Sequence, residues 1–423
     1  MKNKEINQWL WKWHIIAGLV SMPIVLILAI TGGIYLFKDR YEAPRQQRIK
    51  KITVQRYALP FEKQKDLVNA ELHKPVEAIV VPIASNQATE FVTGKFGHKT
   101  SSFIDPYTGD VTGIIKADNG LMYKVRKLHG ELLMGGFGTK IVELVASWMV
   151  VLILTGLYVW WPAKRWRWQG FFVPRWKMGK RILFRDLHSI GGFWISGLLL
   201  LVLAGAFPWT DVVGSNFKKV QQWTKTGFPM AWHGVGIQSQ PDGEPLPLDT
   251  FVQKAKALDL PGTTTIQFPK GPKGVYSISN TYYKDLSQQE KYHYDAYTGE
   301  VLLAQSWSDV GILMRGRMWV MAFHQGQFGP WNWYLMLLIA IGLALTSLSA
   351  GISYILRKRR GSWSLPTVPE HVSVGYGIII AISVLALLFP LFGVSLFLII
   401  LFERFKGANL IPVSSRQVTG REL

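Results

Sequence analysis

Long apolar stretches alternate with polar segments along this chain of 423 residues. About 20 consecutive apolar residues are enough for a helix to cross the hydrocarbon core of a membrane. Five stretches reach or approach that length, at residues 15–37, 141–161, 190–209, 334–356 and 374–402. The fifth exceeds one span and contains Pro390, so it predicts either one kinked helix or a span followed by a re-entrant piece.

The two long polar segments, residues 38–140 and 211–332, have the pattern of small α+β domains. A helical pattern opens each segment, at residues 64–73 and at residues 249–258, where Asp249 is a candidate N-cap. Alternating strand-like runs follow, for example at residues 275–280. The predicted fold is therefore an all-α membrane bundle of about five helices that carries two small α+β domains.

The charge of the chain predicts its orientation in the membrane. The net charge is +20, and basic residues crowd into residues 164–185 and 357–360, each beside an apolar run. Loops rich in lysine and arginine stay on the cytoplasmic side, so the N-terminus is expected inside and both α+β segments in the periplasm. The basic loop is expected to lie on anionic lipid headgroups, and no nucleic-acid partner is predicted.

This topology divides the chain into ten segments. They are the cytoplasmic N-terminus with the first span (1–37), the first periplasmic domain (38–140), the second span (141–162), the basic cytoplasmic loop (163–189), the third span (190–210), the second periplasmic domain (211–332), the fourth span (333–356), a cytoplasmic loop (357–372), the fifth span (373–402) and the C-terminal tail (403–423).

Three markers recur in the same order and indicate an internal duplication. They are His14-Ile-Ile-Ala-Gly18 and His188-Ser-Ile-Gly-Gly192 at the start of spans one and three, Asp105-Pro-Tyr-Thr-Gly-Asp-Val111 and Asp295-Ala-Tyr-Thr-Gly-Glu-Val301 late in the two polar segments, and His129-Gly-Glu and His324-Gln-Gly before spans two and four. Three matches in register predict two copies of a helix–domain–helix unit. Since each copy begins and ends inside, the repeats are parallel. The Asp-x-Tyr-Thr-Gly motifs themselves are typical of tight turns.

Four histidines at duplicated positions form two predicted pairs, His14 with His188 at the cytoplasmic depth and His129 with His324 at the periplasmic depth. Two facing imidazoles at one depth are what a six-coordinate b-type haem requires. Gly18 and Gly192 lie one helical turn after the first pair, where the missing side chain would let a flat macrocycle approach the backbone. The pattern predicts two haem b groups with bis-histidine ligation.

Other roles for these histidines stay open at this point. They could be interfacial anchors, ligands of a bare metal ion, or members of a proton relay. The chain has no cysteine, which excludes disulfides, thiolate-ligated iron–sulfur clusters and c-type haem. His73, His98 and His293 fall in the α+β segments without ligand-like neighbours, and we expect them to be exposed.

A family resemblance rests on four of these features: the His14-x-x-x-Gly18 span, the Asp105 turn motif, the His129-Gly-Glu-Leu-Leu run, and the span that ends in Thr155-Gly-Leu-Tyr-Val-Trp-Trp-Pro. Together they resemble the PepSY-associated transmembrane family, which includes inner-membrane ferric-siderophore reductases that bind haem. The resemblance implies PepSY-type periplasmic domains, b-type haem, and one-electron reduction of chelated ferric iron. Carried over to this sequence, it implies that His14, His188, His129 and His324 are the axial ligands.

The expected function is a multi-pass inner-membrane electron conduit and oxidoreductase. It would pass electrons from a cytoplasmic donor or a quinol to a periplasmic ferric siderophore. No nucleotide or flavin fingerprint occurs in the sequence. Two other functions stay open: a sensor or regulator whose PepSY-like domains bind peptides or proteins, and a transporter built on the parallel repeat.

Overall fold

The computed structural model describes residues 4–161, 168–358, 365 and 375–405. The start of the predicted basic loop, most of the 357–372 loop and the tail after residue 405 lie outside these residues. The chain forms two compact units. The helical unit contains the residues up to 33, residues 128–217 and those from 337 onward, and the sheet unit contains residues 34–127 and 218–336.

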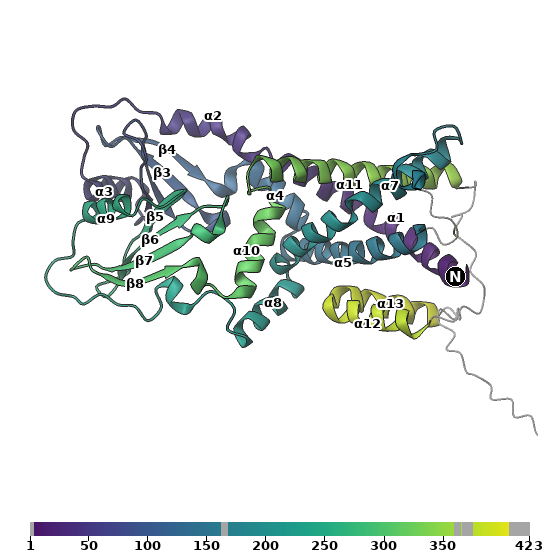
Figure 1. The fold of residues 1–423 in the computed structure, drawn as a ribbon. Coiled ribbons are helices and arrows are strands. Elements are labelled where there is room, and N and C mark those ends of the chain that lie inside the picture. Colours follow the sequence, from purple (N-terminus) through teal and green to yellow (C-terminus); the bar gives the residue numbers. More distant parts are fainter. Residues whose placement is uncertain (1–3, 162–167, 359–364, 366–374, 406–423) are drawn as a thin grey trace, which may run out of the picture. The chain divides into compact units, whose positions relative to one another are not determined.

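Four of the described helices are long and apolar enough to cross a membrane. They are α1 (Lys4–Tyr35), α5 (Gly135–Trp160), α7 (Lys180–Ala206) and α11 (Pro330–Arg357) (Figure 1). Large apolar side chains on their surfaces are exposed, such as Val20 at 73% and Leu345 at 61%, as expected for helices that face lipid. The predicted multi-pass membrane character is therefore confirmed.

The predicted fifth span is not one continuous helix, and it breaks at Pro390, where the sequence placed a possible kink. Residues 373–402 were expected to cross the membrane, with a possible kink at Pro390. The structure has two shorter helices, α12 (Tyr376–Leu388) and α13 (Pro390–Phe405), which pack against each other. Proline lacks the N–H that would continue the helix, so the chain turns at Phe389. Close packing follows, because a Cβ at Gly393 would lie 2.9 Å from the carbonyl oxygen of Ala386.

Shorter helices connect the long ones or cover the sheet. They are α2 (Lys38–Lys50), α3 (Phe61–Leu72), α4 (Leu121–Glu131), α6 (Gln169–Phe172), α8 (Val212–Trp223), α9 (Leu248–Ala257) and α10 (Ile312–His324). Residues 180–189, which were predicted as part of the basic loop, belong to α7.

The sheet unit contains one continuous antiparallel sheet in the order β4-β3-β2-β1-β5-β6-β7-β8. The strands are β1 (Ala78–Val80), β2 (Thr89–Thr93), β3 (Thr100–Ile104), β4 (Val111–Lys116), β5 (Thr263–Gln267), β6 (Val275–Thr281), β7 (Glu290–Asp295) and β8 (Val301–Ser306). The two predicted α+β domains are thus two halves of one sheet. They join where β1 pairs with β5, and Ile79 opposite Ile266 is the central pair of this junction.

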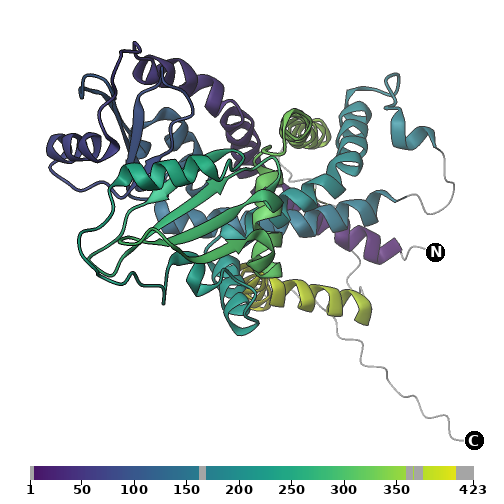
Figure 2. The same cartoon turned by 60° about the vertical axis from the view of Figure 1, so that its left-hand side comes forward.

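One apolar core lies between the sheet and the helices α3 and α9. Phe91, Ile266 and Ile278 from the strands are fully buried, as are Val68 of α3 and Phe251 of α9. Figure 2 shows α9 lying across the strands of the second half. Because both halves contribute to this core, neither half buries its apolar face alone.

The repeated Asp-x-Tyr-Thr-Gly motifs are turns, as predicted. The carboxylate of Asp105 accepts a hydrogen bond from the backbone N–H of Tyr107 at 2.8 Å, and Asp295 accepts one from Tyr297 at 2.8 Å. The glycine of each motif has a positive φ. These carboxylates are therefore structural.

The helices α3 and α9 cap each other. The carboxylate of Asp249 accepts hydrogen bonds from the first backbone N–H groups of α3, those of Phe61 at 2.9 Å and Glu62 at 3.2 Å. Conversely, Glu62 accepts one from the N–H of Leu248 at 3.1 Å, at the start of α9. Carboxylates at helix N-termini satisfy free donors and interact favourably with the helix dipole. This exchange links the two halves of the duplicated sheet unit, and the sequence had suggested Asp249 only as a cap of its own helix.

Replacing Asp249 should destabilise the sheet unit. The Asp249→Ala variant leaves two N–H groups of α3 without their acceptor, which costs about 1–2 kcal/mol. Thermal unfolding of the full-length protein in detergent should show a lower midpoint. Asp242→Ala is the matched control, because Asp242 is exposed in a loop, and an equal loss in both variants would contradict the capping role.

Candidate cofactor site

A cavity of about 770 Å³ lies within the helical unit, bounded mainly by α1, α5, α7 and α11. Its volume falls in the range of about 300–1,000 Å³ that is typical of small-molecule and cofactor sites. The predicted residues His14, Gly18, His188 and Gly192 all line it. The structure therefore brings one predicted histidine pair and its two glycines to one cavity.

The lining of the cavity repeats with the duplication. Every lining residue of α1 has a lining counterpart 174 positions later on α7, and every one of α5 has a counterpart 194 positions later on α11. The pairs between α1 and α7 include Asn7/Arg181, Trp11/Arg185, His14/His188, Gly18/Gly192, Met22/Ser196 and Val25/Leu199. The cavity is therefore formed jointly by both repeats, as expected for parallel repeats that meet at a shared site.

The imidazole rings of His14 and His188 face each other across this cavity. Their centroids are 6.2 Å apart, with an angle of 61° between the ring planes. If two imidazoles share one metal ion through bonds of about 2 Å, and each nitrogen lies about 1 Å from its ring centre, the centroids are about 6 Å apart. The observed separation fits a metal centre held between the two rings.

Hydrogen bonds fix the orientation of both rings. Nδ1 of His188 lies 3.0 Å from the backbone carbonyl oxygen of Thr346, and Nδ1 of His14 lies 3.0 Å from Oγ1 of Thr155. A carbonyl can only accept, and the Thr155 hydroxyl already donates to the carbonyl of Val151 at 2.7 Å. Each Nδ1 therefore carries the proton, and each Nε2 has a free lone pair. This is the arrangement of metal-ligating histidines, which usually donate Nδ1–H to an outer acceptor.

The two imidazoles alone are too few to hold a metal ion, so they suit a ligand that supplies further metal-binding atoms of its own. A zinc ion in a protein usually has three or four protein ligands. Among the residues that the structure describes, no group of three or more His, Cys, Asp or Glu side chains is placed to hold a metal ion. Two imidazoles in a large cavity fit a macrocycle that supplies the remaining donors.

The glycines of the site have two different roles. A Cβ at Gly156 would lie 3.1 Å from Cε1 of His14, so this glycine makes room for the imidazole. At Gly18 and Gly192 a Cβ would meet only ordinary contacts, at 3.9 Å and 3.8 Å. The packing of the chain does not require glycine there, and the missing side chains instead enlarge the cavity beside the histidines.

The two histidines of the second predicted pair belong to different units of the chain. His129 lies at the end of α4 in the helical unit, and its Nδ1 is 3.0 Å from the carbonyl oxygen of Leu28 on α1. A Cβ at Gly32 would lie 3.1 Å from Cε1 of this ring. His129 therefore has the same kind of neighbours as His14. Thr31 and Gly32 contact His129, and Thr155 and Gly156 contact His14. His324 ends α10 in the sheet unit, and the pairing of His129 with His324 stays a prediction.

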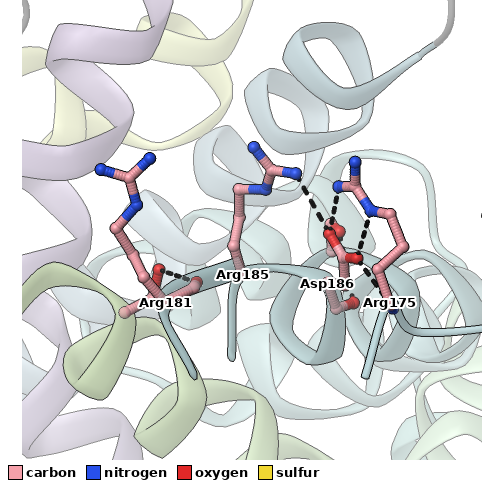
Figure 3. A network of polar contacts seen from close by, with 6 residues as sticks. Arg175, Arg181, Arg185 and Asp186 are labelled. Atoms are coloured by element: carbon pink, nitrogen blue, oxygen red, sulfur yellow. Dashed lines mark hydrogen bonds and ion pairs between the residues drawn. The ribbon is translucent and has the colours of Figure 1, made fainter. Parts of the chain in front are cut away.

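Arginines line one end of the cavity. Arg175 binds the Asp186 carboxylate through two side-chain hydrogen bonds of 2.8 and 2.7 Å, and Arg185 approaches the same carboxylate at 3.3 Å. Figure 3 shows Arg181 beside them on α7, with its guanidinium apart from Asp186. Arg357 of α11 also lines the cavity. The cavity lining therefore contains four arginines and a single carboxylate, which two of the arginines bind, so this end is strongly positive. From the sequence, the basic residues 164–185 were expected to lie on lipid headgroups, and a place in a cavity lining was not foreseen.

His293 was expected to be exposed, and this expectation is wrong. It lies on β7 with no exposed surface, and Nδ1 is 2.8 Å from the Ser277 hydroxyl. Burial, together with the charge of Lys291, lowers the pKa of His293 to about 4. Burial also lowers the pKa of Lys291 to about 8, with a contribution from Lys95. His293 is therefore a neutral core residue of the sheet unit.

Comparison with known families gives a match over most of the chain. The model of the PepSY-associated TM region matches residues 11–357, most of the chain. This range includes all four predicted histidines. A comparison with curated proteins gave no significant match.

The buried His293 should make the stability of the sheet unit depend on pH. The folded state holds its pKa near 4, below the ordinary 6.5, so the unfolded state binds more protons between these values. The stabilisation is complete above pH 6.5 and falls, on the order of 3 kcal/mol, as the pH drops toward 4. Thermal unfolding of the full-length protein between pH 4 and 7.5 should show less pH dependence in His293→Gln. The exposed His98→Gln should behave as wild type, and identical pH profiles for all three proteins would contradict the assignment.

Proposed function

The chain belongs to the PepSY-associated TM family, and we propose that it is a haem-dependent electron-transfer protein of the bacterial inner membrane. His14 and His188 would ligate one haem b, and His129 and His324 a second. The facing imidazoles of His14 and His188 carry this proposal, because their separation and the free Nε2 lone pairs match a bis-histidine site. The Nδ1 hydrogen bond of His129 supports a ligand role for that residue too.

The residues around the first pair would set the properties of the cofactor. The Thr346 carbonyl and the Thr155 hydroxyl keep both Nδ1 atoms protonated, so that Nε2 of each ring can bind metal. The glycines Gly18 and Gly192 leave space for a flat ring system along α1 and α7. Apolar residues such as Leu152 and Leu199 cover the cavity walls and limit water access. When bound, haem would supply reversible one-electron transfer.

Two sites at the two ends of the spans would form a path for electrons across the membrane. In the proposed orientation, His14 and His188 lie near the cytoplasm, and His129 and His324 near the periplasm. The donor would be a cytoplasmic reductant or a quinol. The acceptor would be a ferric siderophore, whose Fe(III) takes up one electron to become Fe(II). Siderophores bind iron through hard oxygen ligands, which hold Fe(II) less tightly, so reduction would release the metal.

Absorbance spectroscopy tests the proposal most directly. The full-length protein, purified in detergent from haem-replete cells, should show a Soret band, and dithionite should produce sharp α and β bands. A colourless preparation from such cells would rule out the haem proposal. It would favour a sensor or a transporter with structural histidines.

Single histidine variants test the ligand assignment. His188→Ala should lose about half of the bound haem, because one of two bis-histidine sites loses a ligand. His14→Ala and the His14/His188 double variant should lose the same half, since both residues belong to one site. His98→Ala is the control, and haem content should be measured per mole of protein. Full haem retention in His188→Ala would show that the ligand assignment is wrong.

The acceptor of the His14 Nδ1–H can be tested separately. Thr155→Val removes the oxygen while nearly preserving the side-chain volume. Loss of such an outer hydrogen bond typically weakens metal binding by roughly 10–100-fold. Thr155→Ser keeps an oxygen and should bind haem nearly as wild type, measured by titration of haem into protein from haem-depleted cells. Equal affinities for the valine and serine variants would show that this hydrogen bond does not support the ligand.

A further inference from the structure

Arg357, the last residue of α11, carries hydrogen-bond donors that lack acceptors. Its guanidinium lies 5.1 Å from the ring centre of Trp11 and 5.7 Å from that of Tyr354. Its Nε and Nη2 atoms are buried and have no hydrogen-bond partner within the part of the chain that the structure describes. Arg357 and both aromatic residues line the cavity. Buried charged donors without acceptors are rare, and an anion at this position would accept hydrogen bonds from the guanidinium.

Arg181 stands on helix α7 and lines the same cavity as Arg357. The Ser353 hydroxyl donates to the Arg181 backbone carbonyl at 3.4 Å, which connects α11 and α7 at this level. Asp186, the acidic residue of the cavity lining, is already bound by Arg175 and Arg185 (Figure 3). Two guanidinium groups of like charge thus line one cavity, and the contacts of the described residues give neither of them a carboxylate partner. An anionic group of a ligand would balance this positive charge.

Both arginines are displaced from the imidazole pair toward the same end of the cavity. Trp11, which Arg357 covers, precedes His14 by three residues, or about 4.5 Å along the helix axis. Arg181 precedes His188 by seven residues, or about 10 Å. Arg181, Arg185, His188 and Gly192 follow one helical face, so the basic end and the imidazole belong to one continuous surface. A ligand centred between the imidazoles would meet the arginines with one edge.

We infer that Arg357 and Arg181 form a carboxylate-binding site for the ligand of this cavity. The inference rests on the proposed function: under it, the carboxylates are the two propionate groups on one edge of haem b. A guanidinium suits a carboxylate, because its planar fork donates two parallel hydrogen bonds. The site is asymmetric although the cavity is duplicated, since Asn7 occupies the position on α1 that corresponds to Arg181. The arginines therefore select one orientation of the ligand in a nearly symmetric cavity.

The test compares haem b with its dimethyl ester, in which both carboxylates are blocked. Each is titrated into the full-length protein from haem-depleted cells, on a His129→Ala background so that the first site is measured. The unsubstituted cavity should bind haem b roughly tenfold or more tightly than the ester. Arg357→Gln, alone or with Arg181→Gln, should remove most of this preference. Arg357→Lys keeps the charge and should retain part of it, which also covers the case in which the glutamine variant does not fold.

Lys358→Gln is the matched control, because it removes one positive charge at the adjacent, exposed position outside the cavity lining. It should keep the preference for haem b over the ester. An equal loss for haem b and ester in Arg357→Gln would mean that the guanidinium only packs against Trp11 or binds a lipid phosphate, and would overturn the inference. An unchanged preference would overturn it as well. Absence of haem binding in all proteins would instead refute the proposed function.

Discussion

The imidazole rings of His14 and His188 lie 6.2 Å apart inside an apolar helix bundle, where the surrounding residues must supply a hydrogen-bond acceptor for each ring. Each ring has a polar N–H that must find an acceptor, because an unpaired donor in an apolar environment is costly. In a helix bundle nearly all backbone carbonyls are used within their own helix, so acceptors are scarce. The acceptors are the backbone carbonyl of Thr346 for His188 and the hydroxyl of Thr155 for His14, each on a neighbouring helix. The same bonds hold the proton on Nδ1, so that Nε2 of each ring keeps an unprotonated lone pair.

The duplication explains how this arrangement is built. A constant separation of 174 residues relates the lining of α1 to that of α7, and one of 194 residues relates α5 to α11. Repeats that meet at a shared axis bring equivalent side chains together, so one histidine position in each repeat gives a pair of histidines at one cavity. The sheet unit uses the same principle, since β1 pairs with β5 and the helices α3 and α9 exchange capping carboxylates. Where the copies differ, as at Asn7 and Arg181, the cavity is no longer symmetric, and a ligand can have one preferred orientation in it.

The sequence predicted the features that depend on pattern and failed on those that depend on distant contacts. Apolar length and the repeated histidines located the long helices and the His14–His188 pair. The joining of two domains into one sheet depends on β1 and β5, which are far apart in the chain and show no signal of pairing. From the sequence, Thr155 is an ordinary helix residue, because its role depends on the imidazole of His14, which lies 141 positions away in the chain. Pro390 marked the break in the last apolar stretch, but only the packing of α12 on α13 shows that the chain folds back there.

The number of metal-binding atoms that the protein supplies distinguishes a bare metal ion from a macrocycle as the ligand of this cavity. A bare metal ion at His14 and His188 would have two protein donors, and the nearest carboxylate of the lining, Asp186, is occupied by two arginines. Such an ion would have to take its other ligands from water within largely apolar walls. A macrocycle brings four donors of its own, fills the volume and needs only two axial nitrogens. It also accounts for Gly18 and Gly192, where a small ion would leave the space beside the backbone empty. A proton relay would need neither the cavity nor these glycines, so the haem proposal explains more of the site with fewer assumptions.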